Sequence, residues 1–146
     1  MNGRVFIDSN ILLYAIESQD VAKARRAGQW LEYLLETGRG VANLQVMNEV
    51  TNVLLRRGTM PPEQVFRVVD TFGAFGATPI SLETTAAARL IRLRTNYQWW
   101  DCILLASAIE LGCSSFLSED LKDGHSFPGL TIISPFRHSP PQLPIH

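Results

Sequence analysis

Apolar residues follow two alternating patterns along the chain. Short runs of β-branched and aromatic residues predict buried strands at 5–7, 41–42, 115–118 and 130–133, and an edge strand at 78–82. Longer stretches with apolar residues at helical spacing predict helices at 11–16, 21–36, 44–57, 61 onward, 84–94 and 101–111. The last of these stretches is apolar on nearly every side, which indicates a buried helix.

Residues that cap or break helices mark the ends of these elements. Ser9 or Asn10 is expected to cap the helix at 11–16. The prolines at 61–62 suit the first turn of a helix, where a missing N–H does no harm. The helices before residues 38, 58 and 112 are expected to end at those glycines, because glycine accepts the left-handed conformation common at helix C termini.

Strands that alternate with helices favour a mostly parallel central sheet with helices on both faces. The chain has 146 residues, enough for one such domain, and it shows no internal repeat or linker. We therefore predict a single α/β domain over residues 1–134. From Pro135 the sequence has four prolines and no periodicity, so residues 135–146 are expected to form a proline-rich, loosely ordered tail.

Composition narrows the class of protein only a little. With 46% hydrophobic and 18% charged residues, the chain has the balance of an ordinary globular domain. Its formal net charge of −1 gives no sign of a nucleic-acid partner, which would need local basic patches. Arginines do cluster, although solvated helix faces or ion pairs explain the clusters at least as well: Arg25 with Arg26, Arg56 with Arg57, and Arg89 with Arg92 and Arg94.

The cysteines and the apolar runs bear on the cellular compartment. Cys102 and Cys113 lack the spacing of a metal finger, and a buried, reduced pair is favoured over a disulfide. The first residues contain only a short apolar run before Asp8, which does not fit a signal peptide. No stretch is long and apolar enough to span a bilayer, so a cytoplasmic protein is expected.

Acidic residues fall where a parallel sheet places its chemistry, at the carboxyl ends of strands. Asp8 directly follows the first strand, and Asp120 lies two residues beyond the strand that ends at Ser118. Asp101 opens the buried helix, and Glu49 lies near the edge of an apolar helix stripe. A hard cation such as Mg²⁺ prefers carboxylate oxygens, and grouped carboxylates repel one another unless a cation neutralises them. The residues alone thus indicate an acidic cleft suited to a divalent metal.

Each acid also has a purely structural explanation, and for an acid taken singly that explanation is the more common one. Asp8 could end its strand in an Asx-turn, and Asp101 could cap its helix. Glu49 could be a solvated helix residue, and Glu119 and Asp120 could be turn residues. Position near the strand ends does not by itself choose a reaction.

Four segments resemble, in order, the motifs of PIN-domain ribonucleases. Residues 5–14 (VFIDSNILLY) look like the opening strand, in which Asp, a hydroxyl residue and Asn precede an apolar helical turn. Residues 45–54 (QVMNEVTNVL) resemble the second acidic helix, and residues 99–108 (WWDCILLASA) resemble an aromatic–Asp pair that opens a buried helix. Residues 117–121 (LSEDL) resemble the fourth motif, a hydroxyl residue two positions before an acid. The size and motifs look like those of VapC-type toxins, the PIN ribonucleases of toxin–antitoxin pairs.

The resemblance implies a Mg²⁺-dependent endoribonuclease that hydrolyses RNA phosphodiester bonds, with Mg²⁺ or Mn²⁺ held chiefly by Asp8 and Asp101. It also implies a complete catalytic set and two supporting polar positions: Asp8, Glu49, Asp101 and Asp120, with Asn10 and Ser118. Glu119 remains the alternative to Asp120 as the fourth acid. The implied partners are RNA, a cognate antitoxin with a segment that fills the cleft, and a second copy in a homodimer. No membrane partner is implied.

Other functions fit the sequence less well. A catalytically inactive PIN-like module that binds RNA or protein would keep the fold and lose acids, yet all four acidic positions are filled. A phosphatase of the haloacid-dehalogenase type usually needs a second Asp where this chain has Asn10. A phospho-receiver domain would need an acidic pair near the first strand and a lysine late in the sheet, and this chain has neither.

Aromatic residues and histidines are weaker indicators. Tyr97, Trp99 and Trp100 could stack RNA bases, but packing in a core or interface is favoured because these rings bury large areas. The histidines lack helical metal-binding spacing and are assigned no role: His125, His138 and His146.

Overall fold

The computed structural model describes residues 3–141 and contains one five-stranded sheet of order β2-β1-β3-β5-β4. The interior strand β1 (Arg4–Ile7) pairs in parallel with β2 (Gly40–Val41) and with β3 (Cys113–Leu117). The strand β5 (Leu130–Ile133) continues the parallel order, and β4 (Ser126–Phe127) closes the edge in antiparallel orientation. The predicted α/β class with a mostly parallel sheet is confirmed.

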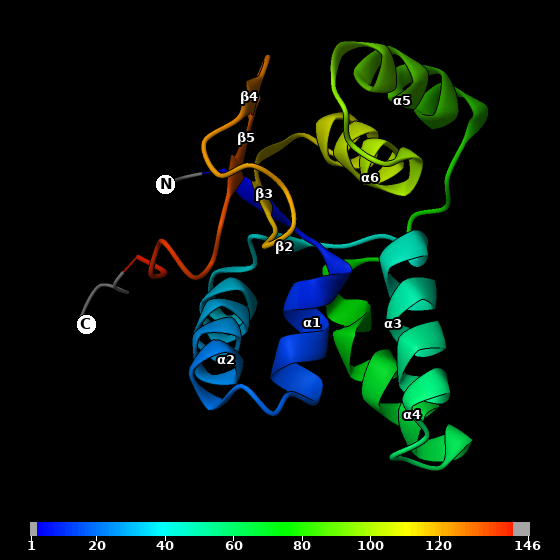
Figure 1. The fold of residues 1–146 in the computed structure, drawn as a ribbon, viewed down its shortest axis with the longest axis vertical. Helices are drawn as coiled ribbons and strands as arrows, with labels where there is room; N and C mark the ends of the chain where they lie inside the picture. The colour runs from blue at the N-terminus through cyan, green and yellow to red at the C-terminus, as the bar shows by residue number, and fades with distance from the viewer. Residues whose placement is uncertain (1–2, 142–146) are drawn as a thin grey trace.

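Helices surround this sheet in two groups (Figure 1). The group formed by α1 to α4 lies on one side, and α5 with α6 lies together on the other. The helices are α1 (Ser9–Ile16), α2 (Val21–Thr37), α3 (Leu44–Arg57), α4 (Pro62–Asp70), α5 (Leu82–Arg94) and α6 (Trp99–Glu110), with a 3₁₀ turn η1 (Thr71–Phe75) after α4. No helix among residues 3–141 has both the length and the apolar character needed to cross a membrane.

The core is built on the two central strands. Val5, Phe6 and Ile7 are completely buried, as expected for a parallel strand covered on both faces. The rings of Phe6 and Phe116 stack across β1 and β3 with centroids 5.4 Å apart. Both cysteines are free and buried, as predicted, and burial raises the pKa of the Cys113 thiol to about 11, so this thiol is inert.

Helix C termini follow the predicted glycines, including Gly112, which has φ of 73° and comes directly after the C-cap of α6, whereas the N-terminal caps differ from those expected. Gly38 and Gly58 adopt the left-handed conformation after α2 and α3, with φ of 68° and 67°. The residue that caps α1 is Asp8, and not Ser9 or Asn10. The helix α6 begins at Trp99 after an N-cap at Gln98, so its first turn contains Asp101 and the alternative explanation of this acid as a helix cap does not hold.

The predicted edge strand at 78–82 is wrong. Thr78 forms only an isolated bridge with Asn43, and α5 already begins at Leu82. Ser81 accepts a hydrogen bond from the Thr84 N–H while the Thr84 hydroxyl oxygen accepts one from the Ser81 N–H, which completes a capping box. Helix capping therefore overrides the local β propensity of this segment. The short strand β4 was not predicted from the sequence.

The start of the C-terminal tail packs against α2, which differs from the loose arm expected from residue 135. The Trp30 indole N–H donates to the carbonyl oxygens of Pro135 and His138, at 3.3 and 2.9 Å. Arg26 also donates to the Pro135 carbonyl. Residues 142–146 of the predicted tail lie outside the described residues, and the boundary at residue 134 stays a prediction.

Close packing at β2 gives a stability prediction. A Cβ on Gly40 would lie 2.6 Å from Cε1 of Phe75 and 3.0 Å from Cβ of Leu34. We expect Gly40→Ala to lower the free energy of unfolding by about 1–3 kcal/mol through overpacking, measured by urea denaturation. Gly28→Ala is the control, because open space surrounds this helical position, and it should stabilise by about 0.5–1 kcal/mol. Equal effects of the two variants would contradict this packing argument.

Candidate active site

The Asp8 carboxyl lies at the carboxyl end of the interior strand β1. The residue is only 4% exposed, and Oδ1 accepts a hydrogen bond of 2.7 Å from the Ser9 N–H as it caps α1. The Ser118 hydroxyl, at the end of β3, donates to Oδ2 at 2.7 Å. Both oxygens of Asp8 are therefore held by donors from the first turn of α1 and from the neighbouring strand.

Burial raises the pKa of Asp8 to about 7. The hydrogen bonds from Ser118 and from the Ser9 N–H favour the charged form and offset part of this rise. The carboxylates of Asp101 and Glu49 raise the pKa further by repulsion. The charged form of Asp8 is thus disfavoured, and a nearby positive charge would stabilise it.

Two helices contribute the second and third acids. Glu49 of α3 accepts a hydrogen bond of 2.9 Å from the Ser9 hydroxyl and one of 3.1 Å from the Gln45 amide. Asp101 lies in the first turn of α6 and is partly buried. Burial raises the pKa of Asp101 to about 6, and repulsion from Asp120 and Glu49 adds to the rise.

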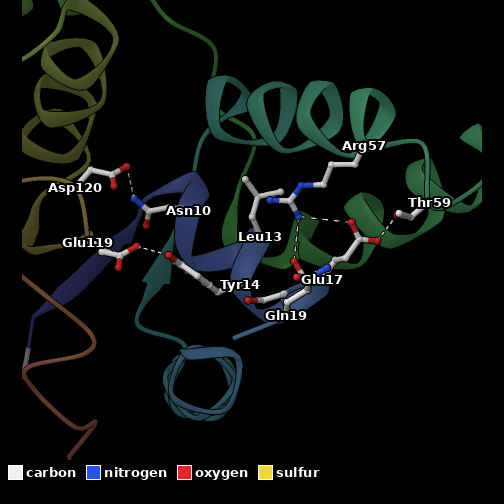
Figure 2. Close-up of a pocket in the computed structure, with 10 residues that line it drawn as sticks. Asn10, Leu13, Tyr14, Glu17, Gln19, Arg57, Thr59, Glu119 and Asp120 are labelled. Atoms are coloured by element: carbon white, nitrogen blue, oxygen red, sulfur yellow. Dashed lines mark hydrogen bonds and ion pairs between the residues drawn. The ribbon is translucent and has the colours of Figure 1, made fainter. Parts of the chain in front are cut away.

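The fourth acid comes from the loop after β3. Asp120 is exposed, and its Oδ2 accepts a hydrogen bond of 2.8 Å from the Asn10 amide (Figure 2). The Ser118 hydroxyl oxygen accepts a hydrogen bond of 3.2 Å from the Asp120 N–H, and the same hydroxyl donates its hydrogen bond to Asp8. Ser118 and Asn10, predicted as supporting polar residues, therefore connect the first acid to the fourth.

Glu119 and Asp120 are adjacent in sequence but have different partners. The Glu119 carboxylate accepts a hydrogen bond of 2.5 Å from the Tyr14 hydroxyl and forms an ion pair with Lys23. Asp120 instead contacts Asn10 and raises the pKa of Asp101. The structure thus places Asp120, and not Glu119, beside Asp101 of the acidic group.

The donor set fits a hydrated hard cation. The charged groups that raise the pKa values of Asp8 and Asp101 are other carboxylates. Within residues 3–141, no three Asp, Glu, His or Cys side chains lie close enough to enclose a metal ion. Mg²⁺ does not require such a cage, because it keeps several waters and is usually bound by one or two carboxylates. Asp8 and Asp101 could supply such carboxylates.

A groove of about 680 Å³ leads away from this acidic group along α1. Asn10, Glu119 and Asp120 line one end of the groove (Figure 2). At the other end, the Arg57 guanidinium donates to the Glu17 carbonyl at 2.9 Å and pairs with the Glu17 carboxylate. The groove therefore has an acidic end at the site and a neutralised ion pair at the far end.

The aromatic residues and histidines noted in the sequence have different surroundings in the structure. Trp100 is 57% exposed and Trp99 is 36% exposed, so packing within this chain does not account for Trp100. Tyr97 packs against the core, and its hydroxyl lies 2.6 Å from Nδ1 of His125. His138 bonds to Asp123, and His146 lies outside the described residues.

Two residues that contact the acids were missed from the sequence. The Ser9 hydroxyl and the Gln45 amide both bond to Glu49. The four-residue spacing of Gln45 and Glu49 on one helix is a usable signal, because side chains at i and i+4 are neighbours. Nothing in the sequence connects Ser9 to an acid 40 residues away.

The fold and the acidic group define an α/β protein with grouped carboxylates at the carboxyl ends of parallel strands. A sequence profile of the PIN domain family matches residues 5–122, and the chain belongs to this family. PIN domains are generally nucleases, and this supports the interpretation that the chain is a hydrolase. No curated protein sequence matches the chain at a significant level.

Several solved structures share the fold. A toxin–antitoxin complex from Klebsiella pneumoniae aligns with a TM-score of 0.68 at 21% identity, covering 90% of this chain and 97% of that chain. VapBC2 from Rickettsia felis, bound to a promoter DNA fragment, gives a TM-score of 0.64 at 17% identity, covering 89% and 97%. VapC20 of Mycobacterium tuberculosis, a sarcin–ricin loop cleaving toxin, gives 0.58 at 14% identity, covering 77% and 86%. At these identities the likeness establishes the fold.

The raised pKa of Asp8 gives a prediction about pH. The pKa of Asp8 is 3.8 in the unfolded chain and about 7 in the folded protein. Between these two pH values the folded protein binds more protons at Asp8 than the unfolded chain does. The contribution of Asp8 to the free energy of unfolding therefore falls as pH rises through this window. Asp8→Asn should therefore stabilise the metal-free protein relative to wild type increasingly from pH 4 to pH 7, measured by urea denaturation in EDTA. Asp123→Asn is the opposite control, because the Ser134 N–H lowers the pKa of Asp123 and its charged form stabilises the fold. A stability difference between wild type and Asp8→Asn that is flat with pH would contradict the burial argument.

Proposed function

We propose that this protein is a metal-dependent endoribonuclease, the VapC-type toxin of a toxin–antitoxin pair, which hydrolyses RNA phosphodiester bonds with Mg²⁺ or Mn²⁺. The observation that carries the proposal is a group of carboxylates from separate parts of the chain. Glu49 and Asp101 lie near enough to buried Asp8 to raise its pKa, and Asp120 acts in the same way on Asp101. VapC20, which shares the fold, is a sarcin–ricin loop cleaving toxin. Membership of the PIN family supports the nuclease assignment.

The roles of the residues follow from their contacts. Asp8 and Asp101 would hold the cation, and Glu49 and Asp120 would complete the acidic set around it. When bound, a divalent cation lowers the pKa of water and screens the charge of a phosphoryl group. Ser118 and the Ser9 N–H fix the rotamer of Asp8, and Asn10 fixes that of Asp120. The acids would repel an RNA strand without such neutralisation.

The partner assigned to the groove is the antitoxin. Leu13 gives the groove an apolar wall, and Glu119 and Asp120 give it an acidic end, which suits a peptide segment with an apolar face and a basic residue. The structural relatives include toxin–antitoxin complexes, which supports this partner. We further propose a cytoplasmic homodimer, with size-exclusion chromatography and light scattering as the test of its mass.

Metal-dependent RNA cleavage is the direct test of the proposed function. Antitoxin-free protein should cut RNA at discrete positions with Mg²⁺ or Mn²⁺ and not in EDTA. Asp101→Asn should lower the cleavage rate by about a hundredfold or more, as loss of an electrostatic catalytic group does. Asp70→Asn is the matched control, because Asp70 is exposed at the end of α4, and it should retain full activity.

The outcomes separate this function from its alternative. Equal cleavage by wild type and Asp101→Asn would indicate a contaminating nuclease. No cleavage by folded protein over a broad RNA pool would favour the alternative, a catalytically inactive PIN-like module that binds RNA or protein.

Exposed Trp100 gives a prediction about the substrate. It lies next to Asp101 in the first turn of α6, so we propose that a base of a single-stranded RNA segment stacks on its ring. Trp100→Ala should raise KM for RNA about tenfold and leave kcat nearly unchanged, because stacking binds substrate without touching the reacting atoms. Leu93→Ala, at a position 82% exposed on α5, is the control in steady-state kinetics. A fall in kcat with unchanged KM would contradict the stacking role.

A further inference from the structure

A cluster of four side chains holds the loop after β3 beside the acidic group. We call Tyr14, Lys23, Glu119 and Phe136 the Glu119 cluster. Glu119 uses one carboxylate oxygen to accept from the Tyr14 hydroxyl of α1 and the other to pair with Lys23 of α2. Both partners therefore come from helices, and Glu119 alone comes from the loop.

Phe136 covers this ion pair. Its ring packs edge to face against Tyr14, with centroids 5.3 Å apart and planes at 84°. The Lys23 ammonium lies 5.1 Å from the Phe136 ring centroid and 5.3 Å from that of Tyr14, within the range of cation–π attraction. The backbone beside Phe136 is itself held, because Pro135 accepts hydrogen bonds from Trp30 and Arg26 of α2.

Three consecutive loop residues thus each bond to a side chain from the N-terminal part of the chain. Ser118 bonds to Asp8, Glu119 bonds to the helices, and Asp120 bonds to Asn10. Asp120 is exposed, and within residues 3–141 the Asn10 amide is the side-chain donor to its carboxylate. Its position therefore depends on the backbone of the loop, which Glu119 anchors.

We infer that the Glu119 cluster is a positioning device that holds Asp120 toward the acidic group, and that Glu119 is not itself a metal ligand. Phe136 lies beyond residues 5–122, the part matched by the family profile, so this chain uses its C-terminal segment to support its site. The inference rests on the proposed metal-dependent function.

The test is Mn²⁺ binding by the full chain, measured by isothermal titration calorimetry without RNA. Lys23→Met is the decisive variant, because positioning and simple electrostatics predict opposite signs. Loss of a positive charge near the acids would by itself tighten cation binding, whereas loss of the anchor weakens it. We expect Lys23→Met and Glu119→Gln each to weaken Mn²⁺ binding about tenfold, the scale typical of residues that orient metal ligands. Asp101→Asn sets the reference for loss of a ligand.

Two further variants guard against trivial explanations. Tyr14→Phe removes only the hydroxyl that donates to Glu119 and should weaken binding in the same direction by a smaller factor. Glu36→Gln removes a carboxylate from the exposed far end of α2 and should leave Mn²⁺ binding unchanged. The double variant of Lys23 and Glu119 should bind Mn²⁺ no more weakly than either single variant, because both residues act through one contact.

Each result has one meaning. Tighter or unchanged binding by folded Lys23→Met would overturn the positioning role. If Glu119→Gln loses Mn²⁺ binding as completely as Asp101→Asn does, Glu119 is itself a metal ligand. That result would also overturn its assignment as a positioning residue. If wild-type protein itself fails to bind Mn²⁺, the proposed metal-dependent function fails, and this inference fails with it.

Discussion

The rest of the site depends on the burial of the Asp8 carboxyl at the end of β1. A carboxyl that is 4% exposed needs hydrogen-bond donors, and it receives them from the Ser9 N–H and the Ser118 hydroxyl. The second donor follows from sheet register, since Ile7 is paired with Leu117 and the next residues are Asp8 and Ser118. A slip of one residue between β1 and β3 would point Ser118 to the other face. Sheet pairing and site geometry are therefore one constraint.

The other carboxylates act on this buried group through charge. Asp101 and Glu49 raise the pKa of Asp8, and Asp120 and Glu49 raise that of Asp101. Such repulsion opposes folding, and functional sites are where proteins commonly retain it. Hydrogen bonds from Ser9 and Gln45 to Glu49 orient an acid without neutralising it. The arrangement thus leaves negative charge available to a cation.

The fold was largely predictable because its signals are local. Apolar spacing and left-handed glycines define α2 and α3, and a parallel sheet places Asp8 and Asp120 at one edge. The strand prediction for residues 78–82 was wrong because a capping box at the start of α5 competes with a short apolar run. The contact between Ser9 and Glu49 joins residues far apart in sequence, and no single-sequence pattern encodes it. The same holds for Phe136, which falls in a proline-rich segment without periodicity and yet packs its ring against Tyr14.

Glu119 and Asp120 show why position in the sequence was not enough to assign the fourth acid. The two carboxylates follow the same strand, and either could reach the strand ends. Tyr14 of α1 and Lys23 of α2 bind Glu119, while Asn10 in the first turn of α1 binds Asp120. Because one carboxylate is neutralised by a lysine and the other lies among carboxylates, neighbouring residues of one type have opposite electrostatic surroundings. Chemical role here follows from tertiary partners, and those partners come from helices that the loop meets only in the folded protein.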